Sequence, residues 1–394
     1  MTFGKRGDRG RSLAQGPGPL GGADGLAAFD YRPRAMAATE RERDPIRVGL
    51  IGFGLAGEVF HAPLISTTRG MVVASIVTSD AGRQARARAA YPGASVLPNA
   101  DALWANAEAH DLVVIGTPNR SHVPLAEAAL DAGLAVVIDK PMAPTAAEGA
   151  RLVEEAESRG LLLTVFQNRR WDGDFLTLRR LLAEGELGRV VRLESRFERW
   201  RPSVDEGAWR EGSDPEEAGG LLFALGAHLI DQAVQTFGPP TRVYAEVERR
   251  RPGAGVDDDA FVALDHDGGV RSHLWMNVLS AIRGPRMRVL GLNGTFEKYG
   301  LDVQEEALSA GGRPGEPGWG REPPERWGTL RVGERDQRIQ TEPGAYERFY
   351  RGLAEAMRSG GPPPVDPRDS VRCLRIIEAA FESARSGSVV PFEG

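Results

Sequence analysis

Residues 46–57 read Ile-Arg-Val-Gly-Leu-Ile-Gly-Phe-Gly-Leu-Ala-Gly, a short apolar run followed directly by the spacing G-x-G-x-x-G. The run is typical of a buried strand, and the glycines are typical of a turn that opens a helix. The first glycine permits the tight turn, the second lets the backbone approach a pyrophosphate, and the third allows close helix packing. The helix N-terminus adds free N–H groups and a partial positive charge. A plain glycine-rich turn is the alternative in a chain with 49 glycines. The context favours a dinucleotide-binding loop made of Gly52, Phe53, Gly54, Leu55, Ala56 and Gly57.

Downstream of this loop, short β-branched runs alternate with alanine-rich segments of helical period. Continuous apolar strands separated by helices are typical of a parallel sheet that is covered on both faces. We therefore expect residues 45–167 to form a doubly wound α/β domain of the Rossmann type that binds a dinucleotide. The predicted strands are 46–51, 71–77, 111–115, 134–138 and 161–166, and the predicted helices are 58–66, 81–90, 122–131 and 145–159.

After Trp171 the pattern changes, because strand-like runs follow one another without helices between them. Such an order indicates a mainly antiparallel sheet with one face able to meet a partner. We expect residues 168–394 to form an α+β domain with a large open-faced sheet for substrate binding and oligomerisation. The predicted strands are 190–200, 242–248, 259–265, 270–278, 287–291 and 295–298, the predicted helices are 175–183, 221–237, 346–357 and 369–386, and 311–324 is a predicted loop.

Composition excludes several functional classes for this chain of 394 residues. The formal net charge of -6 argues against nucleic-acid binding, which needs a cationic surface. The apolar runs are shorter than the roughly 18 residues that cross a bilayer, so no membrane span is expected. A single cysteine, Cys373, excludes an intramolecular disulfide. The N-terminus has no apolar run of the secretory kind, so we expect a cytoplasmic protein. Residues 1–44 read as a disordered tail or as a misassigned start, with Met36 as an alternative first residue.

The end of the second predicted strand bears on cofactor choice. An NAD-selective site commonly carries an acid there, which binds the ribose 2′-hydroxyl. This strand instead ends in Thr78 and Ser79, with Arg83 a few residues further on. Small hydroxyl groups and a guanidinium suit a 2′-phosphate, while Asp80 reads as the N-cap of the next helix. The sequence favours NADP, with NAD as the alternative.

Lysine is scarce in this chain. Of the 49 cationic side chains 46 are arginines, and the lysines are Lys5, Lys140 and Lys298. Because arginine does not release its proton near neutral pH, a retained lysine is a candidate for chemistry that needs a titrating amine. Lys140 follows a predicted strand in Asp139-Lys140-Pro141, where ligands of doubly wound sheets bind; a turn with a surface ion pair is the alternative. For Lys298 we favour a strand-edge position over substrate contact.

Several segments together resemble the Gfo/Idh/MocA family of sugar and polyol dehydrogenases. The resemblance rests on the glycine loop, on Thr117-Pro118-Asn119 with His122, and on Asp139-Lys140-Pro141, where the family usually has Glu-Lys-Pro. The last two segments follow the carboxyl ends of predicted strands and should border the nicotinamide, so Thr117, Pro118, Asn119, His122, Asp139 and Lys140 are expected to contact the cofactor. Further segments are similar to the NADP-dependent scyllo-inositol dehydrogenase branch of the family. They are 167–172, 219–220, 228–231 and 298–302.

The resemblance implies oxidation of a secondary alcohol to a ketone, or its reversal, with hydride transfer to or from NAD(P). In the family the catalytic pair corresponds to Lys140 and His228 here. Imidazole can act as the base, and an ammonium can polarise the carbonyl oxygen. Asp231, one turn after His228, is expected to orient the ring or to bind a substrate hydroxyl. Asn168 and Arg169 are further candidates for substrate binding, because both follow the strand 161–166.

One departure from the family concerns position 224. The family commonly has Asp four residues before the catalytic histidine, and this chain has Ala224. A shifted substrate preference, replacement by another carboxylate and lost catalysis are the three interpretations. The last would make the protein a catalytically silent dinucleotide-binding sensor or regulator.

Metal catalysis is not expected, because no two of the six histidines are spaced as ligands on one helix face. The expected partner is a small polyol or sugar, with neither nucleic acid nor membrane involved. Arg192, Glu194, Arg196 and Glu198 alternate along one strand, as on a solvated face or an interface. The family resemblance favours a homodimer or homotetramer formed through this sheet.

Overall fold

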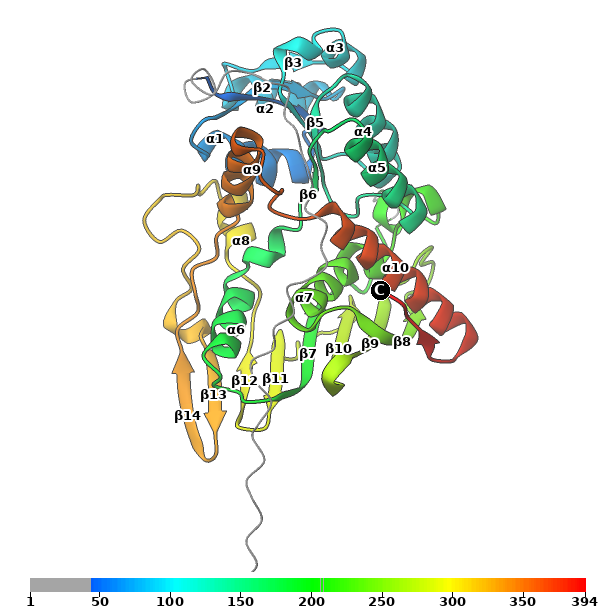
Figure 1. Cartoon of the computed structure of the whole chain (residues 1–394), viewed down its shortest axis with the longest axis vertical. Coiled ribbons are helices and arrows are strands. Elements are labelled where there is room, and N and C mark those ends of the chain that lie inside the picture. The colour runs from blue at the N-terminus through cyan, green and yellow to red at the C-terminus, as the bar shows by residue number, and fades with distance from the viewer. Residues whose placement is uncertain (1–43, 206, 208) are drawn as a thin grey trace, which may run out of the picture. The chain divides into compact units, whose positions relative to one another are not determined.

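A computed structural model describes residues 44–205, 207 and 209–394. The tail predicted for residues 1–44 therefore lies outside the described residues, apart from Asp44, and so does Lys5. Two sheets organise the described part of the chain. Figure 1 shows them with their helices.

The first sheet is parallel throughout and has six strands in the order β3-β2-β1-β4-β5-β6. Its central strands are buried on both faces, as continuous apolar runs require. The strands are β1 (Ile46–Ile51), β2 (Met71–Val77), β3 (Ser95–Leu97), β4 (Leu112–Ile115), β5 (Ala135–Ile138) and β6 (Leu163–Val165). The helices between them are α1 (Ala62–Thr67), α2 (Ala81–Ala90), α3 (Ala100–Trp104), α4 (His122–Asp131) and α5 (Ala146–Ser158).

The strand ends of this sheet are level with one another. Ile51 pairs with both Val77 and Ile115, Ile115 pairs with Ile138, and Ile138 pairs with Val165. The turns that follow β1, β2, β4, β5 and β6 therefore leave the same edge of the sheet. This shared edge brings most of the predicted site residues into one region.

The second sheet has nine strands in the order β14-β13-β12-β11-β7-β10-β9-β8-β15. Neighbours run antiparallel except for β7 and β10, which are parallel. Buried and partly buried residues alternate along β9 and β10, so one face forms a core and the other stays open. The strands are β7 (Val190–Glu198), β8 (Pro240–Glu248), β9 (Asp259–His266), β10 (Arg271–Asn277), β11 (Met287–Gly291), β12 (Gly294–Lys298), β13 (Gly328–Val332), β14 (Arg335–Ile339) and β15 (Val390–Pro391).

Helices of the C-terminal half join the two sheets. α6 (Gly173–Ala183) and α7 (Ala227–Phe237) contribute to the core of the nine-stranded sheet, and α8 (Gln304–Ser309) contributes Leu308 to a core of the first sheet. α9 (Glu347–Ser359) packs against α1 in the same core as β1. α10 (Pro367–Ser386), red in Figure 1, packs against both α5 and β8.

The predicted fold class is confirmed, with a Rossmann-type parallel sheet and a second, mostly antiparallel sheet. The division at residue 167 stays a prediction, and α9 packs with the first sheet although it follows that boundary. The predicted loop 311–324 is irregular up to Pro323, where a short 3-10 turn begins at Pro324.

Candidate active site

The glycine loop after β1 has the shape that a dinucleotide phosphate requires. Gly52 adopts φ +97°, and a Cβ on it would lie 2.5 Å from the Gly116 carbonyl oxygen. A Cβ on Gly57 would lie 2.0 Å from the Gly52 oxygen, so the turn closes only with glycine. A Cβ on Gly54 would instead point into open space, with Arg83 Nη1 as its nearest neighbour at 4.0 Å. The loop therefore leaves a cradle beside a guanidinium, and these residues fit a dinucleotide phosphate.

The three side chains of the loop lie in different environments. Phe53 is buried and packs edge-on against Tyr91, with 6.2 Å between ring centroids. Leu55 is exposed and Ala56 is partly buried at the start of a π-helical turn, Ala56–His61. Any contact of Phe53 with a phosphate would thus come from its backbone.

The end of β2 presents hydroxyl groups, and the carboxylate that follows them caps the next helix. Thr78 is buried, Ser79 is exposed, and Asp80 accepts a hydrogen bond from the Arg83 backbone N–H at 2.7 Å. Asp80 is thus the N-cap of α2, as predicted. Arg83 itself is exposed, with its Nη1 beside the glycine loop.

The turn after β4 is fastened to neighbouring segments. The two ring nitrogens of His122 lie 2.8 Å from the Pro141 oxygen and 3.0 Å from the Thr117 oxygen. The Thr117 hydroxyl accepts a hydrogen bond from Ser121, and Pro118 precedes the short turn Asn119–Ser121. The buried Asn119 amide donates to the backbone oxygens of Glu217 and Ala218 at 2.8 and 3.4 Å. His122 and Asn119 therefore hold turns in place, and their assignment to cofactor contact stays a prediction.

The turn after β5 brings Lys140 to the second half of the chain. Asp139 accepts a hydrogen bond from the Lys140 backbone N–H at 2.9 Å. The Lys140 ammonium donates to the Ala224 carbonyl oxygen at 2.5 Å, one turn before His228. Burial, together with the positive charges of Arg210, Arg169 and Arg199, lowers the pKa of Lys140 to about 8, against the opposing charge of Asp139.

His228 lies in the first turn of α7 and is buried. Its ring centroid is 6.4 Å from that of Phe197, and its Nδ1 has no hydrogen-bond partner among the described residues. Burial lowers the pKa of His228 well below its usual range, and the nearby positive charges of Lys140 and Arg169 act in the same direction. The imidazole is therefore neutral at neutral pH, with a polar atom free for a ligand.

The three residues predicted to bind substrate are placed differently. Asn168 and Arg169 follow β6 at the shared edge, and both are buried. The Arg169 guanidinium donates to Glu305 at 2.8 Å and lies 4.8 Å from the centre of the Phe197 ring. Asp231 is bound through both oxygens by Arg170, at 2.8 and 2.6 Å. The expectation that Asp231 orients the His228 ring is therefore wrong, because its carboxylate holds Arg170 instead.

The expectation for Lys298 is also wrong. β12 has a neighbour on each side, and the Lys298 side chain is 1% exposed. Its ammonium pairs with Glu322 at 3.0 Å and donates to the Tyr299 oxygen at 2.8 Å. Lys298 is a buried ion-pair residue and not a lysine at a strand edge, because strands β13 and β14 extend the sheet beyond it.

Arg199 and Arg210 are near the site but were not predicted from the sequence. The positive charge of Arg199 lowers the pKa of both Lys140 and His228, and that of Arg210 lowers the pKa of Lys140. Arg199 directly follows the alternation of Arg192, Glu194, Arg196 and Glu198 but breaks its two-residue period, so no sequence pattern points to it. Arg210 lies in the short 3-10 helix Trp209–Glu211, and no sequence pattern points to it either.

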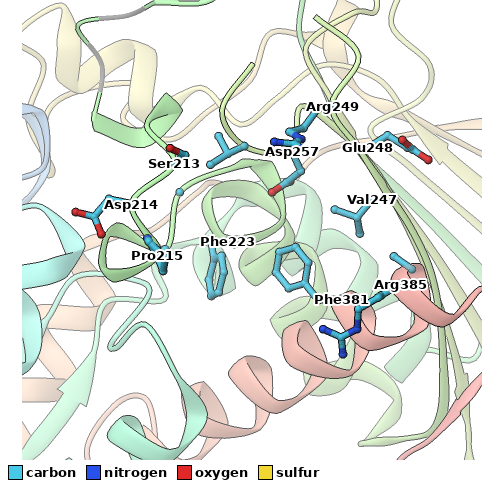
Figure 2. Close-up of a pocket in the computed structure, with 14 residues that line it drawn as sticks. Ser213, Asp214, Pro215, Phe223, Val247, Glu248, Arg249, Asp257, Phe381 and Arg385 are labelled. Carbon is cyan, nitrogen blue, oxygen red and sulfur yellow. The ribbon is translucent and has the colours of Figure 1, made fainter. Parts of the chain in front are cut away.

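A separate cavity of about 590 Å³ lies beside the chain segment that precedes Ala224. Its lining includes Ala218, Gly219 and Phe223, which precede Ala224, but neither Lys140 nor His228. Figure 2 shows the rings of Phe223 and Phe381 beside each other in this cavity. Phe223 lies in the π-helical turn Leu222–Gly226 that leads into α7, and Phe381 lies in α10. The cavity shares a wall with the Lys140 site and is distinct from it.

In the described ranges, no group of three or more His, Cys, Asp or Glu side chains is arranged to hold a metal ion. Within the same ranges, no helix is both long enough and apolar enough to span a membrane.

Comparisons with known proteins agree with this geometry. Residues 46–167 match the model of the oxidoreductase family's NAD-binding Rossmann fold, and residues 179–392 match that of the Gfo/Idh/MocA C-terminal alpha/beta domain. The chain is 37% identical over 357 residues to the scyllo-inositol 2-dehydrogenase (NADP(+)) IolW of Bacillus subtilis, covering 90% of this chain and 98% of that protein. It is 41% identical to the uncharacterized oxidoreductase YdgJ of Escherichia coli, covering 87% and 97%. A crystal structure of an oxidoreductase from Bacillus cereus superposes with a TM-score of 0.79 at 30% identity, covering 89% of this chain and 99% of the other.

Proposed function

This chain belongs to the Gfo/Idh/MocA family of oxidoreductases, and we propose that it is an NADP-preferring dehydrogenase of a cyclic polyol or sugar. It would transfer a hydride between the nicotinamide and a secondary alcohol of the inositol type. The observation that carries the proposal is the Lys140 ammonium, which reaches across from the Rossmann-type sheet to within 2.5 Å of the Ala224 oxygen, one turn before His228. A dinucleotide cradle and an amine with a pKa of about 8 at the same strand edge suit alcohol oxidation.

The residues that would hold the cofactor are those of the shared edge. The loop from Gly52 to Gly57 would receive the pyrophosphate, and Thr78, Ser79 and Arg83 would receive a ribose 2′-phosphate. NADP preference is supported by the absence of a free carboxylate in these residues, because Asp80 caps α2. When bound, the nicotinamide supplies the hydride acceptor or donor of the reaction.

The pKa shifts change the expected division of labour between Lys140 and His228. The buried imidazole stays neutral and is a weak base, so we assign to it a hydrogen bond to the substrate hydroxyl through Nδ1. Lys140, with a pKa of about 8, exchanges the hydroxyl proton. In the oxidation direction the free amine takes the proton, and in the reduction direction the ammonium returns it to the carbonyl oxygen.

The Lys140→Met variant tests this proposal. Its turnover with a panel of inositols and aldoses, followed by absorbance of the reduced cofactor, is expected to fall by at least about 100-fold, the scale of general acid–base catalysis. Its affinity for NADP, measured by fluorescence titration, is expected to stay close to that of the unmodified protein. An unchanged rate would refute the role of the lysine.

The same panel separates the proposal from its alternative. If the unmodified protein binds NADP tightly and turns over no substrate, the catalytically silent sensor suggested by Ala224 is the better interpretation. Faster reduction of NAD than of NADP at equal concentration would overturn the proposed cofactor preference.

We also propose that the chain forms a homodimer or homotetramer through the open face of the nine-stranded sheet. Phe261, His273 and Trp275 form a cluster on that face, with ring centroids 5.1 to 5.9 Å apart. The Arg196 guanidinium lies 4.0 Å from the centre of the Trp275 ring. Aromatic side chains and arginines are enriched where proteins associate. The cytoplasmic location expected from the sequence stays a prediction.

A further inference from the structure

The charges around Lys140 point to the chemical class of the substrate, on the premise that the proposed dehydrogenase function holds. Arg199 follows β7, whose inward-facing side chains are Leu193, Ser195 and Phe197. The Arg199 backbone N–H donates to the Asn277 oxygen at 2.9 Å, next to the last pair of the ladder, Glu198 with Asn277, so Arg199 directly follows the paired end of β7. By the two-residue alternation of a strand, its side chain lies on the same face as Phe197, whose ring neighbours His228.

Arg210 approaches the site from the segment before α7. Its carbonyl oxygen accepts a hydrogen bond from the Gly220 N–H at 3.1 Å, four residues before Ala224. The guanidinium stacks on Trp209 at 4.3 Å and is the strongest of the positive charges that act on Lys140. Arg210 is only partly covered, and the exposed part of the residue can be reached by a ligand.

Neither guanidinium is neutralised within the part of the chain that the structure describes. Other arginines of the region do have partners, since Arg169 pairs with Glu305 and Arg286 lies 3.4 Å from Asp174. Burial lowers the pKa of both Arg199 and Arg210, and no side-chain hydrogen bond opposes this effect.

The acids whose charges act on these arginines, Glu305 on Arg199 and Asp139 and Glu217 on Arg210, are each bound by another group. The Glu305 carboxylate is bound by Arg169. The Glu217 carboxylate is bound by Arg120, and one Asp139 oxygen accepts the Lys140 backbone N–H. Residue 224, whose carbonyl receives the Lys140 ammonium, is an alanine and adds no negative charge. The site thus combines Lys140 with two unpaired guanidinium groups and a neutral His228, so an anion would gain from both arginines.

We propose that the substrate is a polyol or sugar that carries an anionic group, a carboxylate or a phosphate, and that Arg199 and Arg210 bind this group. Guanidinium groups bind both anions in a bidentate manner, so the arginines recognise the shared chemistry. Lys140 and His228 remain for the alcohol that is oxidised. Selection for charge would therefore be separate from the chemistry of hydride transfer.

The test compares matched substrates with the full-length protein and NADP. Glucose, glucuronate and glucose 6-phosphate share one ring, and myo-inositol with its 1-phosphate forms a second series. We expect kcat/KM to be at least about 10-fold higher for an anionic member than for its neutral partner, the scale of one charged hydrogen bond. The better of glucuronate and glucose 6-phosphate identifies the anion. High ionic strength is expected to raise KM for the anionic member and to leave the neutral one unchanged.

Variants show whether the two arginines are responsible. Arg199→Gln and Arg210→Gln are expected to reduce kcat/KM for the anionic substrate about 10- to 100-fold more than for its neutral partner, mainly through KM. Both arginines also lower the pKa of Lys140, so a change common to the two series reports on that amine and not on the anion. Arg199→Lys is expected to restore part of the loss, because it returns the charge without the bidentate geometry. Arg335→Gln, an exposed arginine on β14, is the matched control and is expected to change neither series.

Each result bears on one proposal or the other. Equal or better turnover of the neutral members, or equal losses in both series, would overturn the anion proposal while the dehydrogenase function stands. If no substrate is turned over, calorimetric titration of the cofactor-loaded protein with the same compounds decides. If the anionic member binds and the binding depends on Arg199, the anion site is supported although the dehydrogenase function fails. If the anionic member binds no better than its neutral partner, the anion site is overturned. A loss of NADP affinity in Arg210→Gln without any charge preference would assign this arginine to the cofactor.

Discussion

The amine of Lys140 owes its reactivity to its surroundings. Burial and three arginines lower its pKa, and Asp139 opposes them without cancelling the effect. An ordinary exposed lysine is almost fully protonated at neutral pH and cannot accept a proton from an alcohol. Here the pKa of about 8 brings the free amine within reach of neutral conditions.

The pKa of Lys140 predicts opposite pH profiles for the two directions of the reaction. Oxidation of the alcohol requires the free amine, so kcat/KM should rise with pH and level off above about 8. Reduction of the ketone requires the ammonium, so kcat/KM should fall as pH passes through the same value. Steady-state rates between pH 6 and 10, taken in both directions, check this. Parallel profiles in the two directions would contradict the assignment of Lys140 as the proton-exchanging group.

The buried pair of Lys298 and Glu322 makes a separate prediction about stability. Lys298→Met leaves a carboxylate buried without its partner, which is expected to lower the free energy of unfolding by about 3–5 kcal/mol. The double variant Lys298→Met/Glu322→Leu removes both charges and should regain most of that loss. Urea unfolding of the three proteins measures the difference. A single variant as stable as the parent would show that Glu322 finds another partner.

Residues differ in how far the sequence can identify them. Lys140 is conspicuous because lysine is rare in this chain and because it follows a strand. The pairing of Arg170 with Asp231 joins residues 61 positions apart, and no local pattern encodes it. Arg199 and Arg210 acquire their significance because the acids near them are bound by other groups, which is a property of the fold.

At the scale of elements, the turns at the edge of the parallel sheet depend on bonds to other segments. Asn119, at the start of the turn before α4, holds the backbone of Glu217 and Ala218, next to the glycines that lead into the α7 segment. His122 joins the turns after β4 and β5. These contacts position the turn Leu222–Gly226, which precedes α7, against the turn that carries Lys140.

Loss of the Asn119 contact should therefore affect substrate binding as well as stability. Asn119→Ala leaves two backbone oxygens without their donor, which costs about 1–3 kcal/mol. We expect KM for the substrate to rise several-fold, because the segment before α7 is no longer held. Asn99→Ala, which removes the N-cap of α3, is the control of comparable stability cost, near 1 kcal/mol. Equal KM values in the two variants would show that the Asn119 contact does not position the site.

Element prediction from the sequence succeeded where periodicity was strong. The buried strands β1, β2, β4 and β5 and the helices α2, α4 and α5 lie where apolar runs and helical periods place them. The predicted helix 221–237 contains a π-helical segment, Leu222–Gly226, which supplies the carbonyl that binds Lys140. Such a wide turn depends on tertiary contacts and has no signature in the hydrophobic pattern. The short strand β3 and the exposed hairpin β13–β14 lack that pattern as well.

At the scale of the whole molecule, the open sheet face carries the prediction about assembly. Trp275 lies in its aromatic cluster, and Trp275→Asp would bring a charge into a buried contact. We expect this variant to halve the molar mass found by light scattering, or to reduce it further if a tetramer forms. Leu292→Asp, at the exposed β11–β12 turn, is the control and should leave the mass unchanged. A monomeric parent protein would refute assembly through this face.

The long helix α10 mechanically links the cores of the two sheets. One side of it contributes Val371 and Leu374 to the core beneath the parallel sheet, and the other contributes Ile376, Ile377 and Ala380 to the core of the nine-stranded sheet. A helix that packs into both cores in this way limits how far the two sheets can move apart. Lys140 follows the parallel sheet, and His228 lies in α7, which packs on the nine-stranded sheet. The rigidity of α10 therefore limits how much the distance between the two side chains can vary when a substrate binds. Loosening the packing of α10 would disturb the alignment of Lys140 with His228 before the chain as a whole unfolded.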